Sequence, residues 1–176
     1  RTLNIVRIGT SGSVQADIPV DSFVISEKSI GCDGVLRFYA NNESVCDHPF
    51  EEAFIRHCRW TPSAARPYVV NADPGLVDRL YDEEHTIKGV TLTAVGFYGP
   101  QGRVLRLPLA MPGINDRITA FRYEGYKVTN YEMESAAITG LCNLLGHRAA
   151  TICLIIANRI NGDASADYHS YMNKLI

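Results

Sequence analysis

Residues 126–157 read YKVTNYEMESAAITGLCNLLGHRAATICLIIA, and this stretch decides the fold class. Its first four residues predict a short strand, and Asn130 can cap a helix over residues 131–145 that ends at Gly146. Residues 150–157 are strongly apolar and predict a buried strand. A strand, a helix and a second strand in this order indicate an α/β protein with a mixed, mostly parallel central sheet flanked by helices.

The rest of the chain continues this alternation without repeats or a linker, so we expect a single domain over residues 1–176. The first strand is apolar although it starts almost at the first residue, and the last residues stop within a helix, so we expect the chain to be incomplete at both ends. The pattern predicts strands over residues 3–8, 23–26, 68–71 and 88–97, a turn over 9–12, a loop over 98–102, and helices over 49–58, 74–81 (capped by Asp73), 116–122 and 165–176.

Composition excludes several classes of function. Seventeen Lys and Arg residues against nineteen Asp and Glu give a net charge of −2, so no basic field exists to attract nucleic acid. No apolar run approaches the ~20 residues that span a bilayer, and the first residues lack the pattern of a signal peptide. The five cysteines are scattered without a C-x-x-C pair, which favours reduced thiols and no metal site. We expect a cytoplasmic protein that acts on a small molecule.

Polar side chains follow the apolar strands, where open α/β sheets bind ligands. Arg7 and the glycines and hydroxyls of residues 9–12 can form an anion-binding loop, although an ordinary tight turn fits equally well. Gln101 and Arg103 follow Phe97 in a Gly/Pro-rich loop, which either reads the edge of a ring stacked on Phe97 or is simply solvated. Arg159 lies at the rim of the sheet and either supports a site or caps the surface.

Glu134 is the most informative acidic residue. On a helix starting at Tyr131, its face continues through Ile138 and other apolar residues, whereas Glu132 lies about 200° around the helix. We therefore predict that the carboxylate of Glu134 points into the protein. Burying it costs several kcal/mol unless partners meet it, and these are either a pair of ligand hydroxyls or a core arginine.

Taken in order, four motifs of this chain resemble those of the nucleoside phosphorylase-I family, and the second motif resembles its uridine-specific branch. The likeness covers nearly the whole chain and is weakest over residues 33–70. The motifs are RIGTSG at residues 7–12, FYGPQGR at 97–103, NYEMESA at 130–136 and IIANR at 155–159.

The resemblance implies a role for each matching residue. Arg7, Gly9 and Thr10 would bind phosphate; Thr10, Met133 and Glu134 would hold the ribose; Phe97, Gln101, Arg103, Ile156 and Arg159 would form the base site; and Arg7, Arg103 and Glu134 would be catalytic. Family members that act on purines carry an aspartate where this chain has Asn158, so its absence favours a pyrimidine. Further phosphate-site residues of the family, upstream or from a neighbouring subunit, have no counterpart in this chain.

The implied fold is phosphorylase/hydrolase-like, and the implied activity is that of a pentosyltransferase in pyrimidine salvage, which converts uridine and phosphate to uracil and ribose 1-phosphate. No cofactor is implied beyond phosphate as co-substrate, although a monovalent cation at a dimer interface is compatible with the family. The expected assembly is a homodimer or a hexamer of dimers. Two alternatives stay open: a hydrolytic nucleosidase of the same fold, and a relative that binds nucleosides without catalysis.

Overall fold

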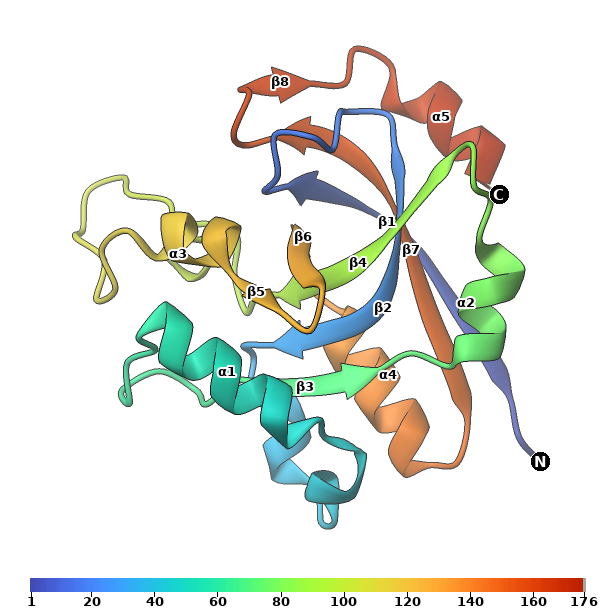
Figure 1. Cartoon of the computed structure of the whole chain (residues 1–176), viewed down its shortest axis with the longest axis horizontal. Helices are drawn as coiled ribbons and strands as arrows, with labels where there is room; N and C mark the ends of the chain where they lie inside the picture. The colour runs from blue at the N-terminus through green and yellow to red at the C-terminus, as the bar shows by residue number, and fades with distance from the viewer. Residues whose placement is uncertain (176) are drawn as a thin grey trace.

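The computed structural model describes residues 1–175 and shows one sheet of eight strands with helices packed around it (Figure 1). The sheet order is β3-β2-β4-β6-β1-β7-β8, and β5 pairs with β6. The strands are β1 (Asn4–Ser13), β2 (Phe23–Gly31), β3 (Tyr68–Asn71), β4 (Thr86–Thr93), β5 (Arg122–Tyr123), β6 (Tyr126–Glu132), β7 (Arg148–Asn158) and β8 (Asp163–Ala164). The α-helices are α1 (His48–Cys58), α2 (Pro74–Leu80), α3 (Ile114–Ala120), α4 (Ser135–Leu144) and α5 (Tyr168–Leu175). The short 3-10 helices are η1 (Val35–Phe38), η2 (Asn42–Val45) and η3 (Gly99–Gln101).

The central sheet is mixed and its longest ladders are parallel, as the sequence predicts. β1 runs parallel to β7, and β2 runs parallel to β4, which in turn runs parallel to β6. The sheet is not open, however, because β2 also pairs with β7 and β6 pairs with β1, both antiparallel. The five strands β2, β4, β6, β1 and β7 therefore close into a barrel-like circuit, which removes most free edges.

Helices cover the barrel from several sides. In Figure 1, α1 and α3 lie on the left of the barrel and α2 and α5 on the right. Phe50 and Phe54 of α1 pack with Ile118 of α3 in the largest apolar cluster, whereas α2 packs on β2 and β7 through Leu76 and Val77. Both α1 and α2 begin at a capping aspartate followed by a proline in the first turn, and the prediction of this cap for α2 is confirmed.

β1 differs from its prediction in two respects. It runs through residues 9–12 to Ser13, so the predicted turn is wrong, and Gly9 and Gly12 sit in the parallel ladder with β7. It is also not a buried strand, because Val6 is 39% exposed and Ile8 is 40% exposed. The reason is that β6 pairs with β1 only at Gly12 and Ser13 among the described residues.

β6 and α4 share a boundary that differs from the prediction. β6 extends to Glu132, and α4 begins only at Ser135, so Asn130 is a buried strand residue and not a helix cap. Other boundaries shift too: β2 extends to Gly31, β4 ends at Thr93 and α5 begins at Tyr168. Position 176, included in the predicted last helix, lies outside the described residues.

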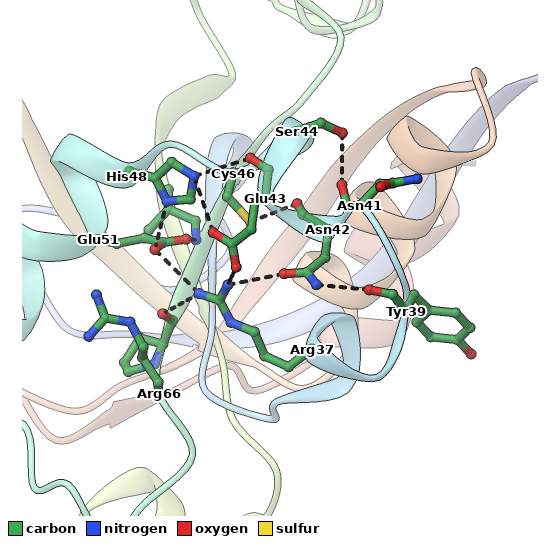
Figure 2. Close-up of polar contacts among 12 residues, drawn as sticks. Arg37, Tyr39, Asn41, Asn42, Glu43, Ser44, Cys46, His48, Glu51 and Arg66 are labelled. Atoms are coloured by element: carbon green, nitrogen blue, oxygen red, sulfur yellow. Dashed lines mark hydrogen bonds and ion pairs between the residues drawn. The ribbon is translucent and has the colours of Figure 1, made fainter.

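A polar cluster anchors the segment between β2 and α1 (Figure 2). The buried carboxylate of Glu51 accepts hydrogen bonds from Val69 N at 3.1 Å and from Arg37 Nη2 at 3.3 Å. Arg37 also donates to Asn42 Oδ1 at 3.1 Å, and His48 lies between Glu51 and the main-chain oxygen of Glu43. These contacts join η1, η2, α1 and β3, so this cluster stabilises the fold.

Candidate active site

All ten residues that the sequence predicts for the site line one cavity of about 480 Å³. The structure adds five residues that the sequence analysis did not assign to it: Ser11, Gly12, Tyr131, Glu132 and Ala157. The lining comes from β1, the end of β6, the end of β7 and the loop after β4. The predicted residues among them are Arg7, Gly9, Thr10, Phe97, Gln101, Arg103, Met133, Glu134, Ile156 and Arg159.

Arg7 lies within β1 and folds over Gly9, two residues further along the same face of the strand. A Cβ atom at Gly9 would lie 2.6 Å from Arg7 Nη1, so only glycine leaves room for the guanidinium there. Arg7 Nη1 donates to the sulfur of Cys153 at 3.3 Å, and burial raises the pKa of that thiol to about 11. Burial lowers the pKa of Arg7, but Cys153 and two carboxylates outweigh that effect and raise it.

Glu132 and Glu134 are the two carboxylates beside Arg7. The antiparallel register pairs Gly12 with Tyr131, so the chain after Tyr131 runs back along β1 towards Arg7. Glu134 forms an ion pair with Arg7 Nη2, and Glu132 Oε2 lies 3.4 Å from Arg7 Nη1. The prediction that Glu134 is the buried carboxylate is wrong, because its side chain is 53% exposed while that of Glu132 is 1% exposed.

Glu132 is buried because it organises the start of α4. Its Oε2 accepts hydrogen bonds from the backbone N–H groups of Glu134 and Ser135, both at 2.8 Å. Its Oε1 accepts from Thr93 Oγ1 at 2.5 Å and from Ser135 Oγ at 2.6 Å. A carboxylate at a helix N-terminus satisfies free backbone donors and interacts favourably with the helix dipole. Glu134 is thereby held at the rim of the cavity, next to Arg7.

The loop after β4 carries the opposite wall. Residues 99–101 form η3, and Gly102 follows with a left-handed φ of 71°. Arg103 then turns back, so that its guanidinium stacks 3.9 Å from the centre of the Phe97 ring and also donates to the Phe97 main-chain oxygen. Arg103 Nη1 donates to Gln101 Oε1 at 2.9 Å. The predicted loop and its cluster of three side chains are therefore present.

Arg159 braces the same loop from the end of β7. Its Nη1 donates to the main-chain oxygen of Gln101 at 3.1 Å, and its Nη2 donates to Gln101 Oε1. A guanidinium can only donate, so two arginines at Oε1 fix which end of the Gln101 amide is the oxygen. Burial, and secondly the charge of Arg103, lower the pKa of Arg159 to about 10, so it is protonated at neutral pH.

Thr10, Met133 and Ile156 complete the lining between the two walls. Asn158 does not line it: its side chain is buried, donates to the carbonyl oxygens of Gln15 and Ile18, and accepts from backbone N–H groups that follow it. In this chain the identity of residue 158 therefore does not argue for a pyrimidine. That preference has to rest on the groups that do face the cavity.

Residues 1–175 contain no group of three His, Cys, Asp or Glu side chains that could hold a metal ion. None of the helices they form has the length and apolar character needed to cross a bilayer. The five cysteines are free thiols, and all except Cys46 are buried.

Comparison with known proteins places these observations in a family. The family model described as "Phosphorylase superfamily" matches residues 2–174. Uridine phosphorylase A of Schistosoma mansoni is 36% identical over 160 residues, which cover 90% of this chain and 49% of that protein. A uridine phosphorylase of Thermococcus kodakarensis is 26% identical over 164 residues, which cover 90% of this chain and 50% of that protein. The chain thus spans about half the length of the curated relatives it matches.

A solved structure agrees at the level of the fold. A nucleoside phosphorylase of Trypanosoma brucei, described as showing uridine phosphorylase activity, superposes with a TM-score of 0.82 at 24% sequence identity. The match covers 98% of this chain and 60% of that one. The family model spans nearly every residue, and the solved structure shares the arrangement of strands and helices. On these grounds the chain belongs to the phosphorylase superfamily.

Proposed function

We propose that the protein catalyses the phosphorolysis of uridine to uracil and ribose 1-phosphate, with phosphate as co-substrate and no further cofactor. The observation that carries cleavage of the nucleoside is the unequal charge of the two cavity walls, and phosphate as the attacking group rests on the family resemblance at Arg7, Gly9 and Thr10. At one wall, Arg7 is met by the carboxylates of Glu132 and Glu134. At the other, neither Arg103 nor Arg159 pairs with a carboxylate of residues 1–175, so two positive charges are uncompensated there.

The difference in charge between the two cavity walls matches the charge that develops when a nucleoside is cleaved. A phosphate oxygen bonds to C1′ while the bond between C1′ and the base nitrogen breaks, and the electron pair of that bond moves into the base. Positive charge develops on the sugar and negative charge on the departing uracil. Donors aimed at developing charge lower the barrier by about 2.7–4 kcal/mol each in comparable sites. Arg103 and Gln101 would stabilise the uracil, while Glu134 would hold the ribose hydroxyls and face the cationic sugar.

The base wall suits the two carbonyl oxygens of uracil. Gln101 Oε1 accepts from Arg103 and Arg159, so the amide N–H groups of Gln101 and the guanidinium of Arg103 would donate to these oxygens. Phe97 lines the same cavity and would pack against the ring.

The first experiment incubates the full-length protein with uridine, with and without phosphate, and measures uracil by chromatography. Phosphate-dependent uracil release supports the proposal, and binding of uridine without uracil release would instead identify a nucleoside-binding protein. Arg103→Ala should remove most uridine turnover, whereas Arg79→Ala, on the exposed side of α2, serves as the matched control. Glu134→Gln should reduce turnover of uridine strongly, and equal activity on uridine and 2′,3′-dideoxyuridine would contradict its ribose role.

A hydrolytic nucleosidase is the second candidate, and one observation favours it. The charge of Arg7 is already compensated by Glu132 and Glu134, so its presence does not by itself require an anion. The charge separation at the base wall serves attack by water as well as attack by phosphate. Uracil release at the same rate without phosphate would select the nucleosidase.

We further propose that the protein works in the cytoplasm as a homodimer or a hexamer of dimers, as the family resemblance implies. Light scattering on the full-length protein measures the assembly directly. A monomer with full activity would contradict this part of the proposal.

A further inference from the structure

We propose that Asn115 is a positioning residue for base recognition, acting through the loop that carries Gln101 and Arg103. This inference rests on the proposed function. Asn115 lies in α3, outside the lining of the 480 Å³ cavity, and belongs to none of the four motifs of the chain.

The base loop needs support because few of its backbone oxygens are bonded within the loop itself. The N–H groups of residues 101, 102 and 103 bond to carbonyls of Tyr98 and Gly99. The carbonyl oxygens of Gln101 and Gly102 accept none of these N–H groups. Asn115 Nδ2 donates to both, at 3.2 Å to Gln101 and at 3.4 Å to Gly102. Buried or half-buried carbonyls without such donors are costly, so the amide is part of the loop's stability.

Asn115 is itself held in one orientation. Its Oδ1 accepts a hydrogen bond from the hydroxyl of Tyr131 at 3.0 Å, which turns Nδ2 towards the loop. The approach is close, because a Cβ atom at Gly102 would lie 2.5 Å from Asn115 Nδ2. Gly102 is therefore required both for its left-handed φ and for the space that the Asn115 amide occupies.

Two supports thus act on the main-chain oxygen of Gln101 from different elements. Arg159 donates to it from the end of β7, and Asn115 donates to it from α3. Tyr131 links the two supports, since its ring lies 4.5 Å from the Arg159 guanidinium and its hydroxyl bonds to Asn115. Loss of the Asn115 support leaves Arg159 as the only side chain of residues 1–175 that donates to the loop backbone at Gln101. The loop can then shift, and small displacements of binding groups cost large factors in rate.

The test compares full-length wild type, Asn115→Ala and the control Asn143→Ala. Asn143 is also a helical asparagine whose Nδ2 donates to a backbone oxygen, but it lies in α4, outside the cavity lining. We expect Asn115→Ala to raise the KM for uridine about tenfold and to leave the KM for phosphate within about twofold of wild type. We expect the control to change neither. An unchanged KM for uridine, or equal increases for both substrates, would overturn the inference.

Two further variants keep the test decisive if Asn115→Ala does not fold. Asn115→Asp preserves the shape and the bond from Tyr131 but removes both N–H donors, so it should raise the KM for uridine as well. Tyr131→Phe should raise it less and should add nothing in the Asn115→Ala background, because the hydroxyl acts through Asn115. Independent effects of these two changes would contradict the mechanism. If wild type releases no uracil, calorimetric binding of uracil to the same variants still tests Asn115 separately from the proposed activity.

Discussion

Replacement of Glu132 tests whether one buried carboxylate holds the site together. Glu132→Ala removes the acceptor of two backbone N–H groups, those of Glu134 and Ser135. The Thr93 and Ser135 hydroxyls, which both donate to Glu132, lie 3.0 Å apart, so one of them can then donate to the other. A buried donor left unsatisfied costs about 1–3 kcal/mol. The Ser135 N–H is buried and the Glu134 N–H only partly so, which gives an expected loss of about 3 kcal/mol in the free energy of unfolding.

Glu132→Gln provides the contrast that makes the estimate testable. Its amide oxygen can stay on the two backbone N–H groups, and its amide nitrogen then faces the Thr93 and Ser135 hydroxyls, which can rotate to accept. The loss is then limited to the charge, including the 3.4 Å ion pair with Arg7, and we expect about 1 kcal/mol.

Urea denaturation followed by circular dichroism measures both losses. Glu52→Ala is the matched control, because Glu52 is an exposed carboxylate paired with Arg66, and such surface pairs contribute about 0–1 kcal/mol. Equal losses for Glu132→Ala and Glu132→Gln would refute the reasoning, since the distinction depends on backbone donors losing their acceptor. A loss for Glu132→Ala no larger than that of Glu52→Ala would refute the burial argument itself.

Two further predictions concern Arg7 and His48. Gly9→Ala places a methyl group within 2.6 Å of Arg7 Nη1 and must displace the guanidinium, so we expect the KM for phosphate to rise about tenfold or more while uracil binding stays unchanged, as measured by steady-state kinetics and calorimetry. A hydrogen bond to Glu51 is the main cause that raises the pKa of His48 above 6.5, with Glu43 adding to it. Because the folded-state pKa is the higher one, this contribution to stability is complete below about pH 6.5 and is lost as the pH rises through the folded-state value. The difference in unfolding free energy between wild type and His48→Gln should therefore shrink as the pH rises above about 6.5, and a constant difference would contradict the assignment.

The fold class and the base loop could be predicted from the sequence because their signals are local. Apolar runs mark the strands, and Asp73 followed by Pro74 marks the start of α2. The Gly/Pro-rich segment around Gln101 and Arg103 is incompatible with a strand or an α-helix, and it forms only the short 3-10 helix η3. Closure of the sheet could not be predicted. The pairing of β2 with β7 joins residues about 130 positions apart, and such a pairing produces no periodic pattern in the sequence.

The turn predicted over residues 9–12 failed for a physical reason. Glycines there suggested a change of chain direction, but neither Gly9 nor Gly12 has a positive φ. Both glycines instead make room for arginine side chains: Arg7 lies against Gly9, and Arg159 Nε would lie 3.2 Å from a Cβ atom at Gly12. A glycine that permits a close side-chain approach and a glycine that permits a turn look the same in a single sequence.

The prediction assigns the wrong glutamate to the interior for a related reason. It places residues 131–134 in a helix, and on a helix Glu134 faces the protein interior while Glu132 faces away from it. In the structure this segment still belongs to β6 and the turn after it, where Glu132 is buried by bonding the N-terminus of α4. Tertiary pairing decides where β6 stops, because its ladder with β4 runs to Glu132 and its ladder with β1 runs to Tyr131.

The charges of the cavity support the proposed preference for a pyrimidine, which the identity of residue 158 does not. A purine leaving group is helped by a proton donor at the base, whereas a uracil anion can be stabilised by donors that never give up a proton. The base wall holds two guanidiniums and one amide, and even the lowered pKa of about 10 leaves Arg159 charged at neutral pH. Such a wall stabilises an anion but offers no proton at pH 7. The proposed preference for a pyrimidine therefore rests on the charge of Arg103 and Arg159 and on the amide of Gln101, and not on residue 158.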